Sequence, residues 1–174
     1  MKTKKFIVSK PPSRPQKGFL LLEVIVAIFL VTVGIAGAII AIQQLVTVTE
    51  IASSQMIGSY LAQEGMEIVR NIRDSNWLGG RAWNAGIFCC SPPPCDCQAD
   101  YRATSLVSFI PGEFLRIDGG FYKYSATGPL TPFIRRIRVA STTVDRIDLT
   151  VFVDWQERGI NYQASTTKHL YNWR

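Results

Sequence analysis

The sequence predicts an α+β fold, in which one long N-terminal α-helix packs on an antiparallel β-sheet. Three observations predict it: an apolar run that begins at Gly18, a helical repeat that continues to residue 78, and alternating strand patterns within residues 79–174. The helix is expected to span a membrane in its first half and to be amphipathic in its second. A chain of 174 residues is too short for a large multidomain enzyme.

Residues 1–17 form a basic leader that contains six Lys or Arg residues, no acid and three prolines. The prolines exclude a continuous helix. The positive-inside rule places this segment in the cytoplasm and everything after about residue 45 outside, so that the chain crosses once, N-in and C-out. Beyond the leader, 13 basic residues balance 13 acidic ones, so the net charge of +6 indicates topology rather than an acidic partner.

The apolar run from Gly18 to Ile42 contains one charge, Glu23. Its 19 residues from Val24 to Ile42 come close to the roughly 30 Å of a hydrocarbon core. The run is too long for the core of a secretory signal, and no A-x-A-like cleavage site follows it directly. We therefore expect a permanent helix in the cytoplasmic membrane that carries an extracytoplasmic head.

The segment Lys17-Gly18-Phe19-Leu20-Leu21-Leu22-Glu23 resembles the prepilin signal of type IV pilins and type II secretion pseudopilins. The resemblance implies that a membrane prepilin peptidase cuts between Gly18 and Phe19 and methylates the new amine of Phe19. It also implies that Glu23 meets the N-terminal amine of a neighbouring subunit and sets the register of assembly. The expected segments are therefore a cleaved leader (1–18), a membrane and assembly helix (19–42), an amphipathic continuation (43–78) and a head (79–174).

The opening Leu21-Leu22-Glu23-Val24-Ile25-Val26-Ala27 is similar to that of V-type minor pilins and of the minor pseudopilin I of type II secretion. Many major pilins carry a proline about twenty residues into the mature helix, and none lies between residues 16 and 91 here. The resemblance implies a non-enzymatic minor subunit whose partners are the peptidase, other subunits and the membrane. Two alternatives are an anchored extracytoplasmic binding protein for DNA or another polymer, and an uncleaved tethered domain without a filament.

Residues 43–73 repeat apolar side chains at spacings of three and four, which indicates a helix with one buried face. That face is expected to contact neighbouring subunits near the membrane and the head further on. Gly34 and Gly37 add a small-residue surface that permits close helix approach. The pair Gly79-Gly80 is expected to end the helix.

The head shows five strand patterns, of which Ile147 to Trp155 alternates most clearly between apolar and other side chains. A turn at 156–159 should join it to a second run at 160–170. The remaining patterns are a hairpin of 114–117 with 121–125 around residues 118–120, and a strand at 133–140. Their order in the sheet is not determined by the pattern.

Four cysteines, Cys89, Cys90, Cys95 and Cys97, lie in the loop 89–97 around three prolines. Disulfides persist outside the cytoplasm, so two bonds within this loop are expected. Bridges across the prolines, 89–97 with 90–95 or 89–95 with 90–97, are favoured over bonds between close neighbours, which are strained. A zinc site made by all four cysteines is the runner-up, although the spacing lacks the usual pairs of cysteines separated by two to four residues. Reactive thiols are a third possibility.

Catalytic motifs are absent from the sequence, and we expect neither an enzyme nor a cofactor. The single histidine, His169, is expected to lie on a strand surface without a catalytic role. Arg135, Arg136 and Arg138 could contact DNA, but no aromatic residues alternate with them as in base-stacking proteins. A solvated strand surface is the expectation, with Arg135 on the opposite face from the other two, and nucleic acid is not an expected partner.

Overall fold

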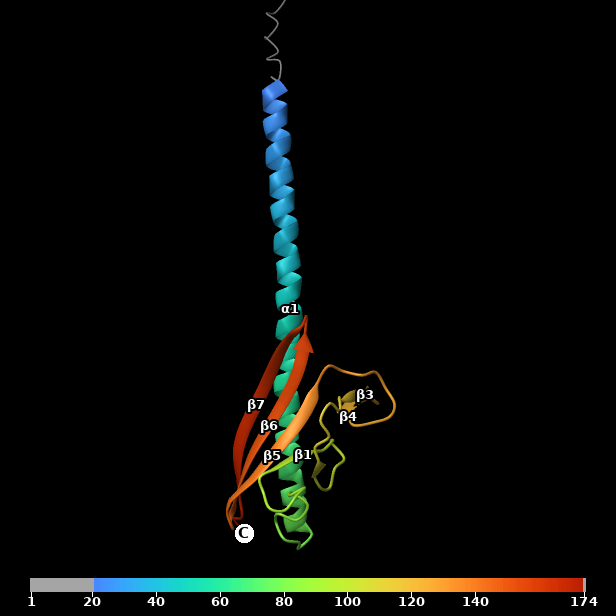
Figure 1. Cartoon of the computed structure of the whole chain (residues 1–174), viewed down its shortest axis with the longest axis vertical. Helices are drawn as coiled ribbons and strands as arrows, with labels where there is room; N and C mark the ends of the chain where they lie inside the picture. Colours follow the sequence, from blue (N-terminus) through green and yellow to red (C-terminus); the bar gives the residue numbers. More distant parts are fainter. Residues whose placement is uncertain (1–20, 174) are drawn as a thin grey trace, which may run out of the picture. The chain divides into compact units, whose positions relative to one another are not determined.

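The computed structural model describes residues 21–173, which divide into two compact units with a boundary between Val46 and Thr47. The predicted processing site, Gly18 and Phe19, lies outside the described residues. The structure confirms the predicted α+β fold of one long apolar helix and a mostly antiparallel sheet (Figure 1). The elements are α1 (Leu21–Leu78), β1 (Cys95–Gln98), β2 (Val107–Ser108), β3 (Arg116–Asp118), β4 (Phe121–Lys123), β5 (Ile134–Thr143), β6 (Arg146–Glu157) and β7 (Ile160–Tyr171).

The first unit contains the helical residues 21–46, all of which are exposed. No heavy atom lies within 4 Å of the Cβ position of Gly34 or Gly37 apart from the helix's own turns. This part of α1 is long and apolar enough to be a candidate membrane span. Its exposed side chains therefore need a partner, either lipid or other helices, because a soluble domain rarely exposes so large an apolar surface.

The second unit contains a five-stranded antiparallel sheet of order β2-β1-β5-β6-β7. β6 and β7 form the predicted hairpin, although its turn is only Arg158-Gly159, because β6 extends to Glu157 and pairs there with Ile160. Both turn residues have positive φ, 52° and 80°, as a two-residue type I′ turn requires. The predicted second hairpin is present as the separate β3–β4 pair, and the predicted fifth strand is β5.

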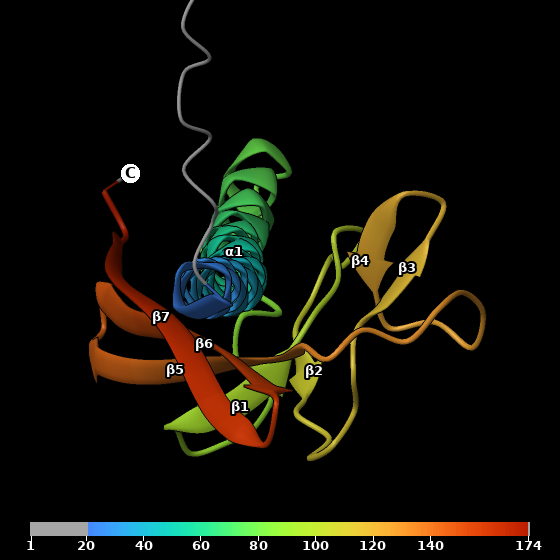
Figure 2. The ribbon, with the colours of Figure 1, turned by 90° about the horizontal axis from the view of Figure 1, so that it is seen from above.

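The core of the head lies between one face of this sheet and the part of α1 that begins near Gly58. Figure 2, which looks along α1, shows the sheet on one side of the helix. Alternate residues of β6 point to the helix, as the sequence pattern predicts. They are Ile147, Leu149, Val151, Val153 and Trp155, each no more than 5% exposed.

Small residues allow α1 to approach the sheet closely at Gly58, Ala62 and Gly65. A Cβ atom built on Gly58 would lie 2.6 Å from Cζ3 of Trp155, and one on Gly65 would lie 2.9 Å from Cγ1 of Val151. Both separations are far below van der Waals contact. The two glycines are therefore required by packing, which outweighs their weakening of the helix.

The helix ends where the sequence predicts, after Leu78. Gly80 has a φ of 65°, its N–H donates to the carbonyl of Trp77 at 3.2 Å, and the N–H of Arg81 donates to the carbonyl of Asn76 at 2.8 Å. This pair of bonds is the Schellman motif, which satisfies carbonyls that would otherwise lack partners. Glycine suits the position because it adopts positive φ without a steric penalty.

Candidate functional site

Glu23 lies in the first described turn of α1 and is exposed. The large apolar side chains around it are exposed as well, from 45% at Val24 to 78% at Leu21. Glu23 is the only charged residue between Leu21 and Ile42. The predicted assembly residue is thus placed on an apolar helical surface, whereas its expected counterpart, the amine of Phe19, falls outside the described residues.

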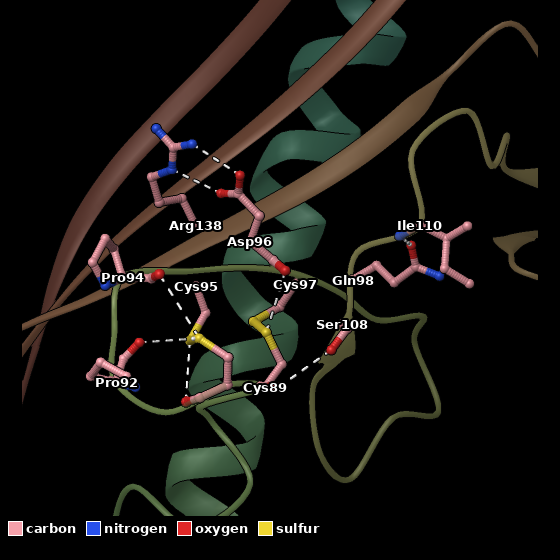
Figure 3. Close-up of a disulfide and its surroundings, with 11 residues drawn as sticks. Cys89, Pro92, Pro94, Cys95, Asp96, Cys97, Gln98, Ser108, Ile110 and Arg138 are labelled. Atoms are coloured by element: carbon pink, nitrogen blue, oxygen red, sulfur yellow. Dashed lines mark hydrogen bonds and ion pairs between the residues drawn. A yellow bond between two sulfur atoms is a disulfide. The ribbon is translucent and has the colours of Figure 1, made fainter.

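The cysteines of the loop 89–97 form two disulfides, Cys89–Cys97 (Figure 3) and Cys90–Cys95. This is one of the two pairings that the sequence favours, with Cα–Cα distances of 5.9 and 5.7 Å. The Sγ atoms of Cys89, Cys95 and Cys97 lie within 4.8 Å of one another. Because all four sulfurs are bonded in pairs, they are not in the thiolate form that zinc binding needs.

The disulfides attach β1 to the loop that directly precedes it, while backbone pairing with β5 and β2 holds β1 in the sheet. Cys95 and Cys97 are buried on the inner face of β1, 3% and 0% exposed, while Asp96 between them faces away from the helix. The end of β2 is attached by the Ser108 hydroxyl, which donates to the Cys89 carbonyl at 3.4 Å, and by the N–H of the next residue, Phe109, which donates to the Asp96 carbonyl at 3.0 Å. Two nested cross-links thus restrain the loop that leads into a strand of only four residues.

Asp96 is the centre of an ion cluster on the outer face of the sheet. Arg138 donates to both of its carboxylate oxygens, at 2.8 and 2.9 Å, and Arg136 donates at 3.3 Å. The hydrogen bond from Arg138 is the main cause that holds the pKa of Asp96 below its ordinary value, although desolvation opposes it. The guanidinium of Arg136 also lies 4.6 Å from the ring centre of Phe152, within cation–π range.

The expectation of a solvated strand surface is wrong for Arg135, which is completely buried between the sheet and α1. Its guanidinium donates to the carbonyl oxygens of Ala99, at 2.7 Å, and Leu61, at 3.4 Å. It also lies 3.5 Å from the carboxylate of Glu64. A guanidinium can be buried only with such partners, and this one joins α1, β5 and the loop after β1.

Tyr124, which directly follows β4, is a further hydrogen-bond partner of Arg135. Its hydroxyl donates to the carbonyl of Arg135 at 2.9 Å. Burial raises the pKa of Tyr124 to about 12, because the phenolate would have to be desolvated. The side chain therefore stays neutral and acts as a hydrogen-bond donor within the structure.

Three acidic residues of α1 form ion pairs with basic residues of β5, β7 and the β6–β7 turn, at points spread along the helix from residue 50 to residue 67. Two of the pairs are about half exposed, so each contributes little stability alone. Together they fix the position of this part of the helix, along its own axis, relative to the sheet. The pairs are Glu50–Arg158 at 2.6 Å, Glu64–Arg135 at 3.5 Å and Glu67–Lys168 at 3.3 Å.

His169 lies on β7 and is exposed. Its Nδ1 is 2.7 Å from a carboxylate oxygen of Asp148 and 3.1 Å from Nη2 of Arg146. The strand register places His169 opposite Asp148, so the histidine belongs to a hydrogen-bonded cluster with Asp148 and Arg146 on the sheet surface.

Neither a protein-family model, nor a curated protein, nor a solved structure matches this chain. A functional interpretation must therefore come from the residues and their geometry.

Proposed function

We propose that this protein is a structural subunit, a minor pilin or pseudopilin, of a type IV pilus or a type II secretion pseudopilus. A prepilin peptidase would cut it between Gly18 and Phe19 and methylate Phe19. The observation that carries the proposal is the surface of residues 21–42, which are helical, exposed and apolar apart from Glu23. Such a surface fits lipid before assembly and the helices of neighbouring subunits afterwards.

The carboxylate of Glu23 gives this surface its specificity. A charge at the centre of a membrane helix costs roughly 2–3 kcal/mol, less near the interface. An amine on Phe19 of a neighbouring subunit would offset that cost, because opposite charges attract strongly where the dielectric constant is low. Only the axial position that brings the two charges together is favoured, so one ion pair would define how far each subunit is displaced along the filament.

The head supports the proposal because it is a compact unit with its own core. A head of this kind can be carried outside the membrane and displayed on a filament while the apolar helix is transferred from lipid to protein. The partners of the proposed subunit are the prepilin peptidase, other subunits through the helix, and the membrane.

Mass spectrometry of the protein extracted from membranes tests the processing step. The proposal expects an N-terminus at methylated Phe19, whereas an intact Met1 or a cut elsewhere would refute it. In the host that makes the filament, Glu23→Gln is expected to be processed normally but to be lost from sheared filaments. Glu50→Gln removes a charge from the same helix at a half-exposed ion pair and is the matched control, which should be incorporated normally.

The same fractionation separates the filament subunit from an anchored binding protein. A binding protein would be found in the membrane fraction and would be missing from sheared filaments even as the wild type. Equal incorporation of wild type and Glu23→Gln would instead show that the carboxylate does not determine assembly.

A further inference from the structure

β7 is the last strand of the five-stranded sheet, so one of its edges pairs with no other strand of the described residues (Figure 1). The sheet ends on its other side in β2, which is only two residues long. Proteins protect sheet edges with short strands, prolines or charged side chains, because an open edge can pair with another chain. Residues 160–167 contain neither a proline nor a charged residue. This stretch of β7 is therefore an open and unprotected edge.

The two-residue turn between β6 and β7 determines which backbone groups point out from this edge. The residues that flank such a turn, here Glu157 and Ile160, form a hydrogen-bonded pair. Bonded and non-bonded pairs then alternate along the hairpin, and the N–H of Asn172 donates to the carbonyl of Asp145 at 2.9 Å in the same phase. Every second residue of β7 therefore directs its N–H and C=O away from β6, and none of the hydrogen bonds among the described residues uses these groups between residues 160 and 168. They belong to Asn161, Gln163, Ser165 and Thr167.

A hollow of about 460 Å³ lies between this edge and α1. From the helix it is lined by an exposed row of side chains spaced four residues apart, and from the strand by residues 162–166. The side chains of Gln163 and Ser165 point to the outer face of the sheet, because Tyr162, opposite Trp155, points to the helix. Gln163 and Ser165 therefore line the hollow through the backbone of the strand edge, which faces the same space as the helix row. The row consists of Gln55, Ser59 and Gln63.

Two ion pairs lie near the ends of this hollow and show how helix and strand run. Glu50 pairs with Arg158 at 2.6 Å, and Glu67 pairs with Lys168 at 3.3 Å. Between these pairs α1 rises about 26 Å, and β7 extends about 27 Å from residue 160 to residue 168. The helix and the strand thus run side by side in the same direction. Together they border a site that is long enough for an extended segment of several residues.

The chemistry of this site selects its ligand. The outward N–H and C=O groups repeat every second residue, and an extended polypeptide backbone presents donors and acceptors at the same repeat. Among the described residues that line the hollow, none is charged. A charged side chain that entered it would lose water without gaining a partner. The ligand that fits is an extended peptide segment whose helix-facing side chains are uncharged.

We propose that the open edge of β7 binds an extended segment of a different protein, which adds a strand to the sheet. Alternate side chains of that strand would enter the hollow next to Gln55, Ser59 and Gln63. A second copy of this chain fits less well, because antiparallel pairing of two β7 strands would set their α1 helices in opposite directions. The candidate membrane span lies at one end of α1, so the two spans would then point away from each other. The proposal goes beyond the filament role, because it requires only the folded head.

A displayed library of random ten-residue peptides tests for such a ligand. The target is the full chain in a zwitterionic detergent, and empty micelles remove peptides that bind the detergent. Enriched peptides are expected to carry uncharged residues at every second position. Titration calorimetry gives the affinity of the most enriched peptide, and the same peptide with N-methylated alternate amides is the matched control. The control should not bind, because it lacks the backbone donors of one edge.

Hydrogen exchange, followed by NMR, locates the bound peptide on the strand. In the protein alone, the outward amides of Gln163 and Ser165 are expected to exchange faster than the amides of Ala164 and Thr166, which bond to β6. The peptide should slow the exchange of the outward amides and leave the inward ones unchanged. Binding elsewhere on the head would not produce this alternation.

Ser165→Pro tests the backbone contact directly. It removes an outward N–H that makes no bond to β6, and proline is tolerated at such edge positions. The peptide carbonyl would then lack a partner, so binding should weaken roughly 5- to 100-fold. Ser165→Ala removes the same side chain, keeps the N–H and should bind like the wild type. Thr166→Lys, which places a charge in the hollow, should also weaken binding, at least about 10-fold, and tests the site without altering the backbone.

Four results would overturn the proposal. They are a library from which no peptide is enriched over empty micelles, binding that Ser165→Pro and Thr166→Lys both leave unchanged, protection of amides outside the edge of β7, and a dimer of this chain that Ser165→Pro dissociates. The last result would show that a second copy occupies the edge. Circular dichroism checks that the variants keep the wild-type fold. None of these results bears on cleavage at Phe19, so this proposal and the proposed function succeed or fail separately.

Discussion

Replacing Gly58 with alanine should destabilise the head because Trp155 cannot move away. The new Cβ would lie 2.6 Å from Cζ3 and 3.0 Å from Cη2 of the indole, which is itself packed against Tyr162 and Phe133. Overpacking of this kind costs about 1–3 kcal/mol, whereas alanine improves helix propensity by about 1 kcal/mol. The net expectation is a loss of roughly 1 kcal/mol, measured as a lower urea midpoint of the full chain in detergent.

The same substitution in a variant without the Trp155 indole tests whether the steric contact causes the destabilisation. Trp155→Leu removes the indole, so Gly58→Ala should stabilise that variant through helix propensity alone, by up to about 1 kcal/mol. Gly37→Ala, at a position with no heavy atom within 4 Å outside the helix's own turns, controls for propensity in the wild-type background. The steric argument fails if Gly58→Ala shifts the urea midpoint in the same direction with and without Trp155.

Three further predictions concern the head. Cys89→Ala/Cys97→Ala opens a loop of roughly nine residues and should lower the free energy of unfolding by about 2.6 kcal/mol, read from urea unfolding under non-reducing conditions. The pKa of Asp96 is lower in the folded state than its ordinary value of 3.8. Its contribution to the free energy of unfolding is therefore present above that ordinary pKa and is lost as the pH falls through the folded-state pKa. Urea midpoints between about pH 5 and pH 2 should show this loss, and Arg138→Ala should reduce it. The pKa of Tyr124 is raised from 10.0 to about 12. Its contribution to the stability of the folded state is therefore complete below its ordinary pKa and is lost as the pH rises toward the folded-state pKa. Tyr124→Phe should remove this part of the alkaline pH dependence of the urea midpoint, and absorbance at alkaline pH measures the phenolate directly.

The long helix and the β6–β7 hairpin can be predicted because each depends on a periodic local pattern. An apolar run without proline indicates one helix, and strict alternation from Ile147 to Trp155 indicates one buried strand face. β1 escapes prediction, because a four-residue strand that directly follows three prolines resembles a loop. Its partner, β5, begins 36 residues after the end of β1, and no local pattern reports a pairing over that distance.

Arg135 shows how a local pattern can be correct while its interpretation is wrong. Alternation places it on the opposite face from Arg136 and Arg138, which is the face of the buried Ile137 and Val139. Arginine is seldom buried, so the sequence favours a solvated position. The carbonyls and the carboxylate that make its burial possible come from α1 and from the loop after β1, and sequence spacing does not reveal them.

The order of the core elements along the chain has a consequence for folding during synthesis. The inner face of α1 around Gly58 and Gly65 is covered by strands that the last third of the chain supplies, β5 to β7. Contacts between such distant segments form slowly. The helix therefore leaves the ribosome while the face that will contact the sheet is still uncovered. Because its last strands come from the C-terminal part of the chain, the head completes its fold only after nearly the whole chain has been synthesised.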